Sequence, residues 1–406
     1  MTRSTWMVGL GSLTPEQRRI VNLDTRSNHL IFGPAGSGKT LLLLHRAQRL
    51  MVQFKIPADR IRVLVYTNVL RSYIQSGITS VGLSIDVVQT FYTWVSALAK
   101  QMKVHAPSGT DANDRYLENL RAVLAHVKKE RIQPILDIAL VDEGQDLPQE
   151  AYQLLVCLCR HVTVFADYAQ RIFDNGAHVS EIAKALGISK ESTLLLKDLR
   201  NSRDVARVAA HFLPASDGER YLRSQSVIDL PGQRRIPVLF RGTNPMDEWD
   251  FLKTVVQQQV QQNRRVGILV PTRYLVYLVH KQLTERGIAV TKIERWQTDE
   301  VDFNELSPKV LTVHSAKGLT FDTVIIPQMV QRWYNQSKQA IAPLLFVGVT
   351  RARDWVCLCT TQGQEIPELA VLKPLIEEGV LFVQTPAAPR TGGDEPSSEP
   401  FDDVPL

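Results

Sequence analysis

Residues 33–40 read Gly-Pro-Ala-Gly-Ser-Gly-Lys-Thr and match the pattern G-x4-G-K-S/T at every fixed position. The apolar run Asn28–Phe32 precedes this segment, and a stretch of helical period begins near Lys39. In a strand–loop–helix unit of this kind, glycines let backbone N–H groups approach phosphate oxygens at the helix N-terminus. The chain must therefore contain a parallel α/β sheet with a phosphate-binding loop at its carboxyl edge. The residues predicted to hold the nucleotide phosphates are Gly33, Pro34, Ala35, Gly36, Ser37, Gly38 and Lys39, and the Thr40 hydroxyl is predicted to bind Mg²⁺.

Two acidic residues, Asp142 and Glu143, follow the apolar run 137–141. A carboxylate at the carboxyl end of a strand, facing the phosphate loop, can supply the second protein ligand to Mg²⁺. Asp142 is predicted to hold the metal directly or through water, and Glu143 to orient and deprotonate the attacking water. A solvated acidic loop is the alternative interpretation.

Apolar runs of strand length alternate with helical segments along both halves of the 406-residue chain. This alternation predicts an α/β protein of two tandem domains with parallel sheets, residues 1–200 and 201–384. Residues 92–137 break the rhythm and contain an amphipathic helix. Its apolar stripe is predicted to be buried against the first domain, and a partner surface is the alternative. The stripe consists of Leu117, Leu120, Leu124 and Val127.

The formal net charge is +5, although residues 385–406 contain five acidic side chains and one arginine. The remainder is therefore more basic than the total indicates, which fits a polyanion-binding protein. Residues 385–406, rich in Pro, Gly and Ser, are predicted to be disordered. No apolar run is long enough to span a membrane and residues 1–12 lack a signal-peptide pattern, so we expect a cytoplasmic protein without a membrane partner.

Four cysteines form two C-x-C pairs within apolar runs, and the predicted role is packing in the core. Zinc binding is the alternative, although zinc sites usually space such pairs more widely. The residues are Cys157, Cys159, Cys357 and Cys359.

Several segments between about residues 13 and 362 resemble, in order, the motifs of the UvrD/Rep helicases of superfamily 1. They are residues 13–17, 33–40, 141–146, 166–170, 199–202, 313–322 and 346–352. The resemblance implies two RecA-like domains with an ATP cleft between them. It also implies an adenine contact for Gln17, a γ-phosphate sensor at Gln170, an arginine directed to that phosphate at Arg200, a nucleotide-binding position at Gly318 and an arginine finger at Arg351.

Segments 66–68 and 90–92 resemble the family's FTN and TFH segments, which contact single-stranded DNA. The resemblance implies phosphate contacts from Thr67, Asn68 and Thr90, stacking by Phe91, and further contacts from Thr272 and His314. From the residues alone, the alternatives are a core position for Phe91 and a helix cap for Thr67, and the order of the phosphate motifs favours the nucleic-acid role.

The chain departs from the family pattern at four places. Leu199 stands where the family has a tyrosine that stacks on adenine, and Thr320 replaces a glutamate that holds the ribose. The segment after Gln170 lacks the family's base-stacking tryptophan. The accessory insertion of the first domain is reduced to 92–137, and between Ile288 and Lys309 there is no room for that of the second.

The sequence therefore predicts an ATP- and Mg²⁺-dependent translocase on single-stranded DNA, with 3′→5′ polarity by resemblance and conditional helicase activity. A nucleotide-gated switch that loads or regulates a partner such as a nuclease is the alternative, and an RNA-directed motor is a third. The terminal segment Phe401–Leu406 resembles the acidic peptide of bacterial single-stranded-DNA-binding proteins. The resemblance implies genome-maintenance enzymes as partners, and a solvating tail is the alternative.

Overall fold

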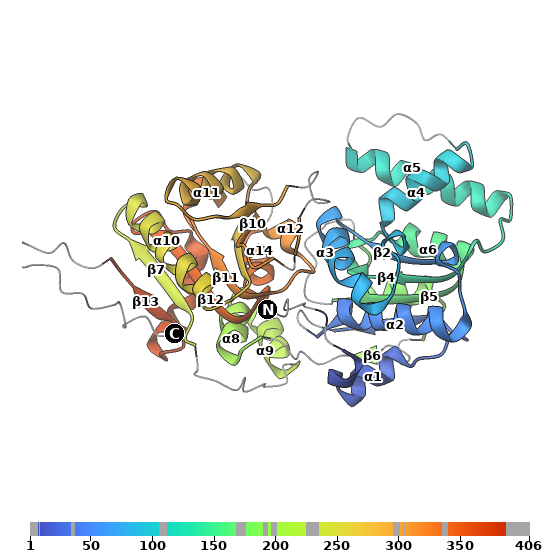
Figure 1. Ribbon diagram of the computed structural model, residues 1–406, viewed down its shortest axis with the longest axis horizontal. Coiled ribbons are helices and arrows are strands. Elements are labelled where there is room, and N and C mark those ends of the chain that lie inside the picture. The colour runs from blue at the N-terminus through green and yellow to red at the C-terminus, as the bar shows by residue number, and fades with distance from the viewer. Residues whose placement is uncertain are drawn as a thin grey trace, which may run out of the picture. The chain divides into compact units, whose positions relative to one another are not determined.

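The computed structural model describes residues 7, 9–33, 37–104, 112–167, 176–189, 194–195, 201–224, 235–294, 301–303, 305–334 and 340–386. The chain divides into two units (Figure 1). Unit 1 comprises Met1–Asp198 and Arg295–Glu305, and unit 2 comprises Leu199–Glu294 and Leu306–Leu406. Within unit 1, the buried Phe303 ring meets Tyr73 edge-to-face at 5.5 Å.

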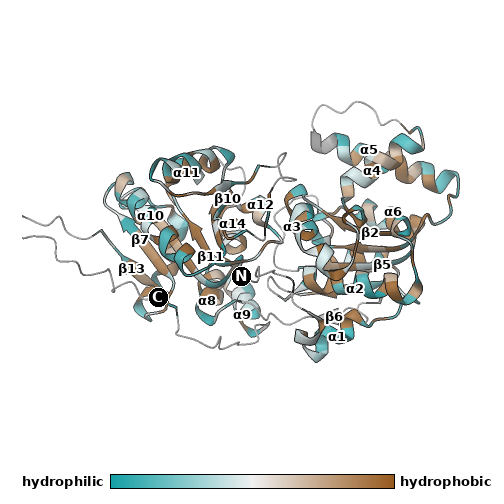
Figure 2. Ribbon diagram, viewed as in Figure 1, coloured by the Kyte–Doolittle hydropathy of each residue, from teal (hydrophilic) through white to brown (hydrophobic). Residues whose placement is uncertain are grey.

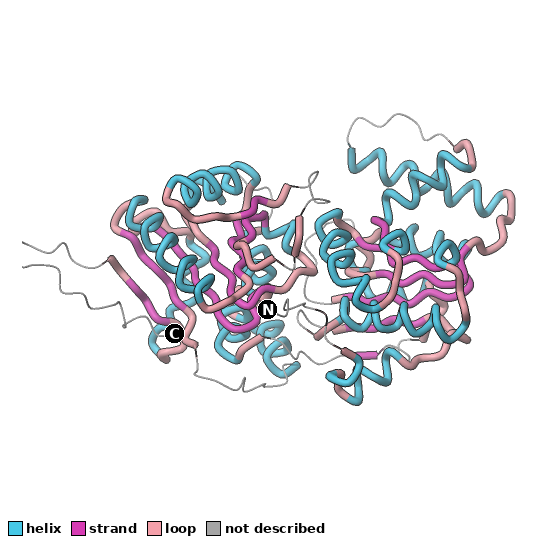
Figure 3. The backbone as a smooth tube through the Cα atoms, in the orientation of Figure 1, coloured by secondary structure: helices cyan, strands magenta, loops and turns pink. Residues whose placement is uncertain are grey.

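A parallel sheet forms the centre of unit 1, with the described strands in the order β3-β2-β4-β5-β1-β6. Its central strands β4 and β5 are largely buried on both faces because helices cover both sides, as the tube in Figure 3 shows. The strands are β1 (His29–Phe32), β2 (Ile61–Val65), β3 (Val88–Thr90), β4 (Leu136–Val141), β5 (Cys159–Ala166) and β6 (Leu194–Leu195).

The helices of unit 1 lie between successive strands, as βαβ connections require, apart from α1, which precedes β1. They are α1 (Pro15–Val21), α2 (Lys39–Phe54), α3 (Asn68–Ile78), α4 (Phe91–Gln101), α5 (Ala112–Lys129), α6 (Gln149–Leu158) and α7 (Val179–Ala185). Short 3₁₀ turns occupy Leu10–Ser12, Ala58–Arg60, Thr79–Val81, Ile85–Val87 and Gly144–Asp146.

Helices α4 and α5 form most of the segment predicted as a reduced insertion, and α5 packs against both α4 and α6 (Figure 1). Leu120, Leu124 and Val127 are buried in the core of unit 1, and Leu117 is partly buried against it. The prediction that this apolar stripe packs on the parent domain is therefore confirmed.

Unit 2 is built around a second parallel sheet, with strand order β13-β7-β12-β11-β8-β10-β9. The strands are β7 (Val238–Gly242), β8 (Val266–Val270), β9 (Thr291–Lys292), β10 (Lys309–Thr312), β11 (Phe321–Ile326), β12 (Ala352–Thr361) and β13 (Phe382–Gln384). The helices are α8 (Arg203–Ala210), α9 (Ala215–Ser224), α10 (Pro245–Gln261), α11 (Arg273–Glu285), α12 (Val313–Ala316), α13 (Gln331–Tyr334), α14 (Ile341–Val349) and α15 (Lys373–Glu377), with a 3₁₀ segment at Pro367–Leu372.

Alternate residues of the unit 2 strands pack against opposite layers of helices. Val238, Ile268 and Cys357 belong to the core cluster that α10 and α11 cover. Helices α8 and α14 pack on the opposite side, against β11 and β12. Figure 2 shows the result as apolar strands between helices whose outer surfaces are polar. The predicted fold class, two tandem RecA-like α/β units with parallel sheets, is confirmed.

The cysteines lie where core packing was predicted. Cys159, Cys357 and Cys359 are buried, and Cys157 is half-buried against the core of unit 1. The described residues contain no group of three or more His, Cys, Asp or Glu side chains placed to hold a metal ion. Across the same residues, none of the helices combines the length and apolar character needed to span a bilayer.

One carboxyl group is buried inside unit 2. Glu248 on α10 is 0% exposed and accepts hydrogen bonds from the Gln328 backbone N–H and the Thr361 hydroxyl. Burial raises the pKa of Glu248 to about 7, against the opposing effect of these hydrogen bonds. The native state therefore holds an extra proton between the ordinary pKa of 4.5 and about 7, and its stability falls as the pH rises through this interval.

Glu248→Gln is expected to remove this loss of stability, because the amide keeps the shape of the protonated acid and has no charge to bury. Near pH 8 the variant should be more stable than the wild type by up to about 3 kcal/mol, since one pKa unit corresponds to about 1.4 kcal/mol. Urea unfolding at about pH 5 and pH 8 measures the difference. Glu285→Gln, an exposed position on α11, is the control. An unchanged pH dependence in Glu248→Gln would contradict the assignment.

Candidate nucleotide-binding site and nucleic-acid-binding edges

The glycine-rich loop joins β1 to α2 at the carboxyl edge of the unit 1 sheet. The Gly33 N–H donates to the Ala166 carbonyl over 3.1 Å, which ties the start of the loop to the end of β5. Gly38 is the N-cap of α2 with φ at +86°, a left-handed conformation that a side chain would strain. Ser37 and Thr40 are buried beside it. The described part of the loop thus directs the N-terminus of α2 at the edge where a phosphate is expected.

The Lys39 ammonium group is held inside this loop. Its Nζ donates to the Gly33 carbonyl over 2.8 Å and lies 3.6 Å from an Asp167 carboxylate oxygen. Both side chains are almost fully buried. Asp167 directly follows β5, so the three neighbouring strands β4, β5 and β1 each end next to a residue of the site. Such a buried ammonium group is positioned to donate to phosphate oxygens in place of the carbonyl.

The residues predicted to hold Mg²⁺ are brought together. The Thr40 hydroxyl donates to the Asp142 carboxylate over 2.7 Å, although the two residues come from α2 and from the end of β4. Burial, and then the charge of Glu143, raises the pKa of Asp142 to about 6. An adjacent divalent cation would relieve both effects, because it favours the charged carboxylate. A hydroxyl and a carboxylate are also the oxygen donors that Mg²⁺ prefers, so the two residues fit the ion.

Glu143 is fixed by a neighbour that the sequence interpretation did not use. The Gln145 side-chain amide donates to a Glu143 carboxylate oxygen, and its carbonyl oxygen accepts from the Asp167 N–H over 2.8 Å. Glu143 itself has φ at +51°, an uncommon backbone conformation for a residue with a side chain. Gln145 thus connects the predicted general base to Asp167, the residue that approaches Lys39. The sequence showed Gln145 and Asp167 only as members of their motifs and did not indicate these contacts.

The predicted adenine contact, Gln17, lies at the start of α1. It forms a capping box with Thr14, and its Nε2 lies 3.5 Å from the Ser37 carbonyl of the phosphate loop. Helix α1 is held at its other end by Arg46 of α2, which is 0% exposed. The Arg46 guanidinium donates to the Leu23 carbonyl over 2.7 Å and to the Asp24 carbonyl over 3.1 Å. Arg46 therefore ties the element that carries Gln17 to the helix that carries Lys39.

In unit 2, Gly318 and Arg351 lie together at the amino edge of the sheet, just before β11 and β12. Gly318 has φ at +81°, and the Phe321 N–H donates to the Arg351 carbonyl over 2.9 Å. The Arg351 guanidinium donates to the carbonyls of Val347 and Leu319 over 3.1 and 3.4 Å. These backbone carbonyls hold the guanidinium in place and are exchangeable partners.

The loop that carries Arg351 is tied to the segment that follows Arg200 in the sequence. The Asn201 side-chain amide donates to the carbonyls of Thr350 and Ala352, over 3.3 and 2.6 Å, on either side of Arg351. The Ser202 N–H donates to the Arg353 carbonyl over 2.7 Å. These contacts bring the predicted arginine motifs into one region of unit 2.

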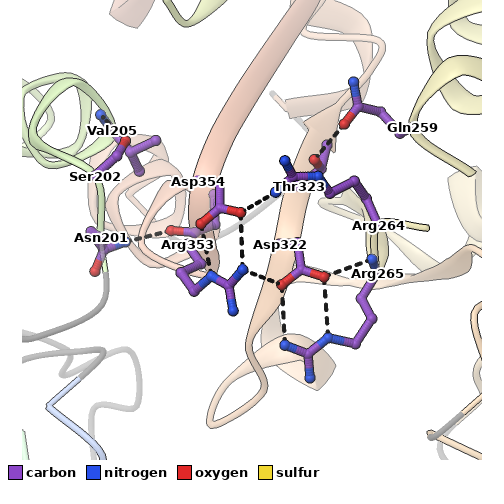
Figure 4. Close-up of polar contacts among 11 residues, drawn as sticks. Asn201, Ser202, Val205, Gln259, Arg264, Arg265, Asp322, Thr323, Arg353 and Asp354 are labelled. Atoms are coloured by element: carbon purple, nitrogen blue, oxygen red, sulfur yellow. Dashed lines mark hydrogen bonds and ion pairs between the residues drawn. The ribbon is translucent and has the colours of Figure 1, made fainter. Parts of the chain in front are cut away.

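An ion-pair network supports the same edge (Figure 4). Arg353 pairs with Asp354 over 2.7 Å and with Asp322 over 3.2 Å, and Asp322 also pairs with Arg265 over 3.1 Å. Arg264 pairs with Asp354. The network joins the beginnings of β8, β11 and β12, where Arg351 stands.

Most of the residues predicted to contact DNA lie at the carboxyl ends of strands, where helices begin. Thr67, Thr90 and Thr272 are the N-caps of α3, α4 and α11, and each hydroxyl accepts a backbone N–H of its own helix. Asn68 is the first residue of α3, and the half-buried His314 lies on α12 directly after β10. Thr67 thus has the helix-capping role that the sequence left open. These residues lie at the carboxyl edge of each sheet, where the N-termini of the following helices can bind phosphate.

Phe91 has a different position from the one predicted. Its ring is 0% exposed and packs in the core of unit 1 near Trp94, with ring centroids 6.0 Å apart. A ring in this position has no face open to a nucleobase, so the predicted stacking role of Phe91 does not fit this conformation. The pattern of the residues allowed a core position, and burial under α4 and α5 is the reason for it.

Some predicted residues lie outside the described part of the chain. They are Pro34, Ala35 and Gly36 of the phosphate loop, together with Gln170, Arg200 and the terminal segment Phe401–Leu406.

Unit 1 has the features of a P-loop nucleotide-binding protein. The phosphate loop, the Lys39 ammonium and the Thr40–Asp142 pair lie at one edge of its sheet. Comparison with protein families makes this more specific. The model described as the UvrD/REP helicase N-terminal domain matches residues 13–105, and that described as the UvrD-like helicase C-terminal domain matches residues 309–359. The chain is therefore similar to the UvrD-like helicases in both of its halves.

Among solved structures, one that is similar to part of this chain is described as the C-terminal domain of a possible DNA helicase from Lactobacillus plantarum WCFS1. The two share 18% sequence identity with a TM-score of 0.35, and the similarity covers 45% of this chain and 97% of the other. A search of curated proteins gave no match.

Proposed function

We propose that the protein is an ATP-dependent translocase on single-stranded DNA, with 3′→5′ polarity and with strand separation that depends on context. The observation that carries the proposal is the assembly of Lys39, Thr40, Asp142 and Glu143 at one edge of the unit 1 sheet. These residues come from two separate segments of the sequence, and their proximity supports roles in phosphoryl transfer.

The roles of the residues follow from their positions. Lys39 and the N–H groups at the start of α2 bind the phosphates of ATP, and Gln17 reads the base. Thr40 and Asp142 hold Mg²⁺, which supplies charge neutralisation to the transferred group. Glu143, held by Gln145, orients the attacking water and accepts its proton. Arg351, Arg200 and Gln170 are assigned to the γ-phosphate by the family resemblance.

The positions of the DNA contacts support a motor. In unit 1 the nucleotide residues follow β1 and β4, whereas Thr67 and Thr90 follow or end β2 and β3. In unit 2, Arg351 lies at the amino edge of the sheet and Thr272 at the carboxyl edge. Each unit therefore has separate places for nucleotide and DNA, so that hydrolysis can change the DNA grip of one unit relative to the other.

The test is steady-state ATP hydrolysis without nucleic acid and with single-stranded DNA, duplex DNA or RNA. We expect strong stimulation by single-stranded DNA. Displacement of streptavidin from biotin at the 3′ or the 5′ end then reports movement and its polarity. Faster displacement from the 5′ end is the result expected for 3′→5′ movement, and displacement from the 3′ end alone would contradict the polarity.

A nucleotide-gated switch that loads or regulates a partner is the second candidate. The observation that favours it is the short connection from β9 to β10, residues 293–308, where the family's second accessory insertion is absent. A switch would hydrolyse ATP without displacing streptavidin from either end, so the same assay separates the two functions.

Glu143→Gln is expected to bind ATP normally and to lower kcat by about 10²–10⁴-fold, the usual contribution of a general base. The substitution keeps the shape of the side chain and its hydrogen bonding with Gln145. Single-turnover hydrolysis and binding of a fluorescent ATP analogue measure the two effects. Glu150→Gln, which changes a glutamate on α6 paired with Arg121, is the matched control and should retain full turnover. Wild-type kcat in Glu143→Gln would remove Glu143 from the mechanism.

A further inference from the structure

An aromatic pair lies at the carboxyl edge of the unit 2 sheet. Tyr274 is the second residue of α11, which follows β8, and Trp333 belongs to α13, which follows β11. Their ring centroids are 5.2 Å apart and their planes are inclined by 33°. The Tyr274 side chain is 61% exposed, the largest exposure among the aromatic residues noted as exposed in the described chain. Two adjacent rings at the surface form a contiguous apolar patch, and such patches can mark interaction sites.

The two rings are supported differently. Trp333 is half-buried, packs on the core of unit 2, and its indole N–H donates to the Gln328 side chain over 3.4 Å. Tyr274 stands on the surface against it. A fixed ring beside an exposed one offers a flat apolar surface whose position is set by the fold, and such surfaces stack unpaired nucleobases at little entropic cost.

The surroundings of the pair are basic. The Arg332 guanidinium lies over the Trp333 ring at 4.3 Å, and Arg273 beside Tyr274 is exposed. Tyr277 lies about one turn further along α11, and the Lys292 ammonium of β9 is 4.4 Å from the centroid of its ring. Glu294 pairs with Lys292 and offsets its charge. Cations next to aromatic faces match a polyanion with aromatic bases, whereas an apolar protein partner would not need them.

The position of the pair continues the predicted DNA contacts. Strands β11, β8 and β10 are neighbours in the sheet and run in the same direction. Their carboxyl ends therefore carry Trp333, then Thr272 and Tyr274, then His314 in spatial order. Adjacent strands are about 4.8 Å apart, so these residues can lie along one short stretch of a strand of nucleic acid.

We propose that Tyr274 and Trp333 form a stacking platform for unpaired bases of single-stranded DNA, and that Arg273 and Arg332 neutralise the adjoining phosphates. The inference rests on the proposed function and adds a binding site to it. The platform in unit 2 also provides a stacking surface in a chain whose segment after Gln170 lacks the family's stacking tryptophan.

The experiment measures the dissociation constant of the full chain for fluorescein-labelled oligothymidylate by anisotropy, with a non-hydrolysable ATP analogue present. Tyr274→Ala is expected to raise the dissociation constant by about 5- to 150-fold, the range for loss of one base-stacking contact. Tyr274→Phe keeps the ring and should bind like the wild type. Phe382→Ala, which removes a ring that is 42% exposed on β13, is the matched control and should have no effect.

A second probe separates stacking from phosphate binding. An abasic oligonucleotide of the same length has the backbone charge without the bases, so wild type and Tyr274→Ala should bind it equally. Equal weakening on both probes would overturn the stacking assignment. Because Tyr274 is exposed, its variants are expected to unfold at the same urea concentration as the wild type. Trp333→Phe tests the half-buried member of the pair with an aromatic ring still present.

The result for the wild type distinguishes the two proposals. If the wild type binds oligothymidylate and its ATPase is stimulated, an unchanged dissociation constant in Tyr274→Ala overturns the platform and leaves the motor function intact. If the wild type neither binds nor is stimulated, both proposals are overturned.

Discussion

Lys39→Ala is expected to lower kcat for ATP hydrolysis by about 10³-fold or more. Removing one neutral donor from a preorganised oxyanion site costs about 10²–10³-fold, and Lys39 carries a full charge. The substitution also removes the ammonium group 3.6 Å from the buried Asp167 carboxylate. Breaking a buried ion pair in this way costs about 3–5 kcal/mol of folding free energy, so lost activity must be separated from lost structure. Steady-state hydrolysis and urea unfolding measure the two effects.

The double variant Lys39→Ala/Asp167→Asn makes this separation. Removing the carboxylate charge together with the ammonium charge is expected to recover most of the lost stability, because no unbalanced charge is left at this pair. Turnover should remain lost. Near-normal hydrolysis in either variant would show that Lys39 does not act on the phosphates.

Arg351→Ala is expected to lower DNA-stimulated kcat by about 10³–10⁵-fold, the effect of removing an arginine finger. Binding of ATP should change far less, because the charge that Arg351 stabilises develops in the transition state. The comparison of kcat with the affinity for a fluorescent ATP analogue measures this difference. Arg351→Lys keeps the charge but lacks the planar donor geometry, and we expect a loss almost as large.

Arg353→Ala is the matched control for Arg351. It lies two residues further along the chain, on β12, and its side chain is 39% exposed, in ion pairs with Asp322 and Asp354. Its loss should reduce stability slightly and leave kcat near the wild-type value. If Arg353→Ala lowers kcat as much as Arg351→Ala, the effect comes from the structure of this edge, and the catalytic assignment of Arg351 is wrong.

Local patterns predicted much of the fold. The strand–loop–helix pattern around residues 33–40 and the alternation of apolar runs led to two parallel α/β sheets, and the apolar stripe of α5 led to its burial. The predictions omitted the short strands β3, β6, β9 and β13. Each has only two or three residues, so its position depends on pairing with a neighbouring strand rather than on a local run.

In the candidate site, too, local sequence patterns identified some residues, whereas others could be recognised only from their contacts in the structure. Lys39, Thr40, Asp142 and Glu143 could be identified because their chemistry requires fixed spacing to glycines or to the end of a strand. Gln145 and Arg46 could not, because a bridging amide and a buried guanidinium are defined by what they contact. The only local sign of Arg46 was a charge within the apolar helix that follows the phosphate loop.

The sequence by itself determined the class of this protein, because phosphate binding needs particular residues at short, fixed separations along the chain. The tertiary structure decided which aromatic rings are open to a ligand. Phe91, predicted to stack, is covered by α4 and α5, whereas Tyr274 and Trp333, distant in sequence, meet at one edge because β8 and β11 are neighbours. Exposure and contact depend on how strands are ordered in a sheet, and no local pattern of residues contains that order.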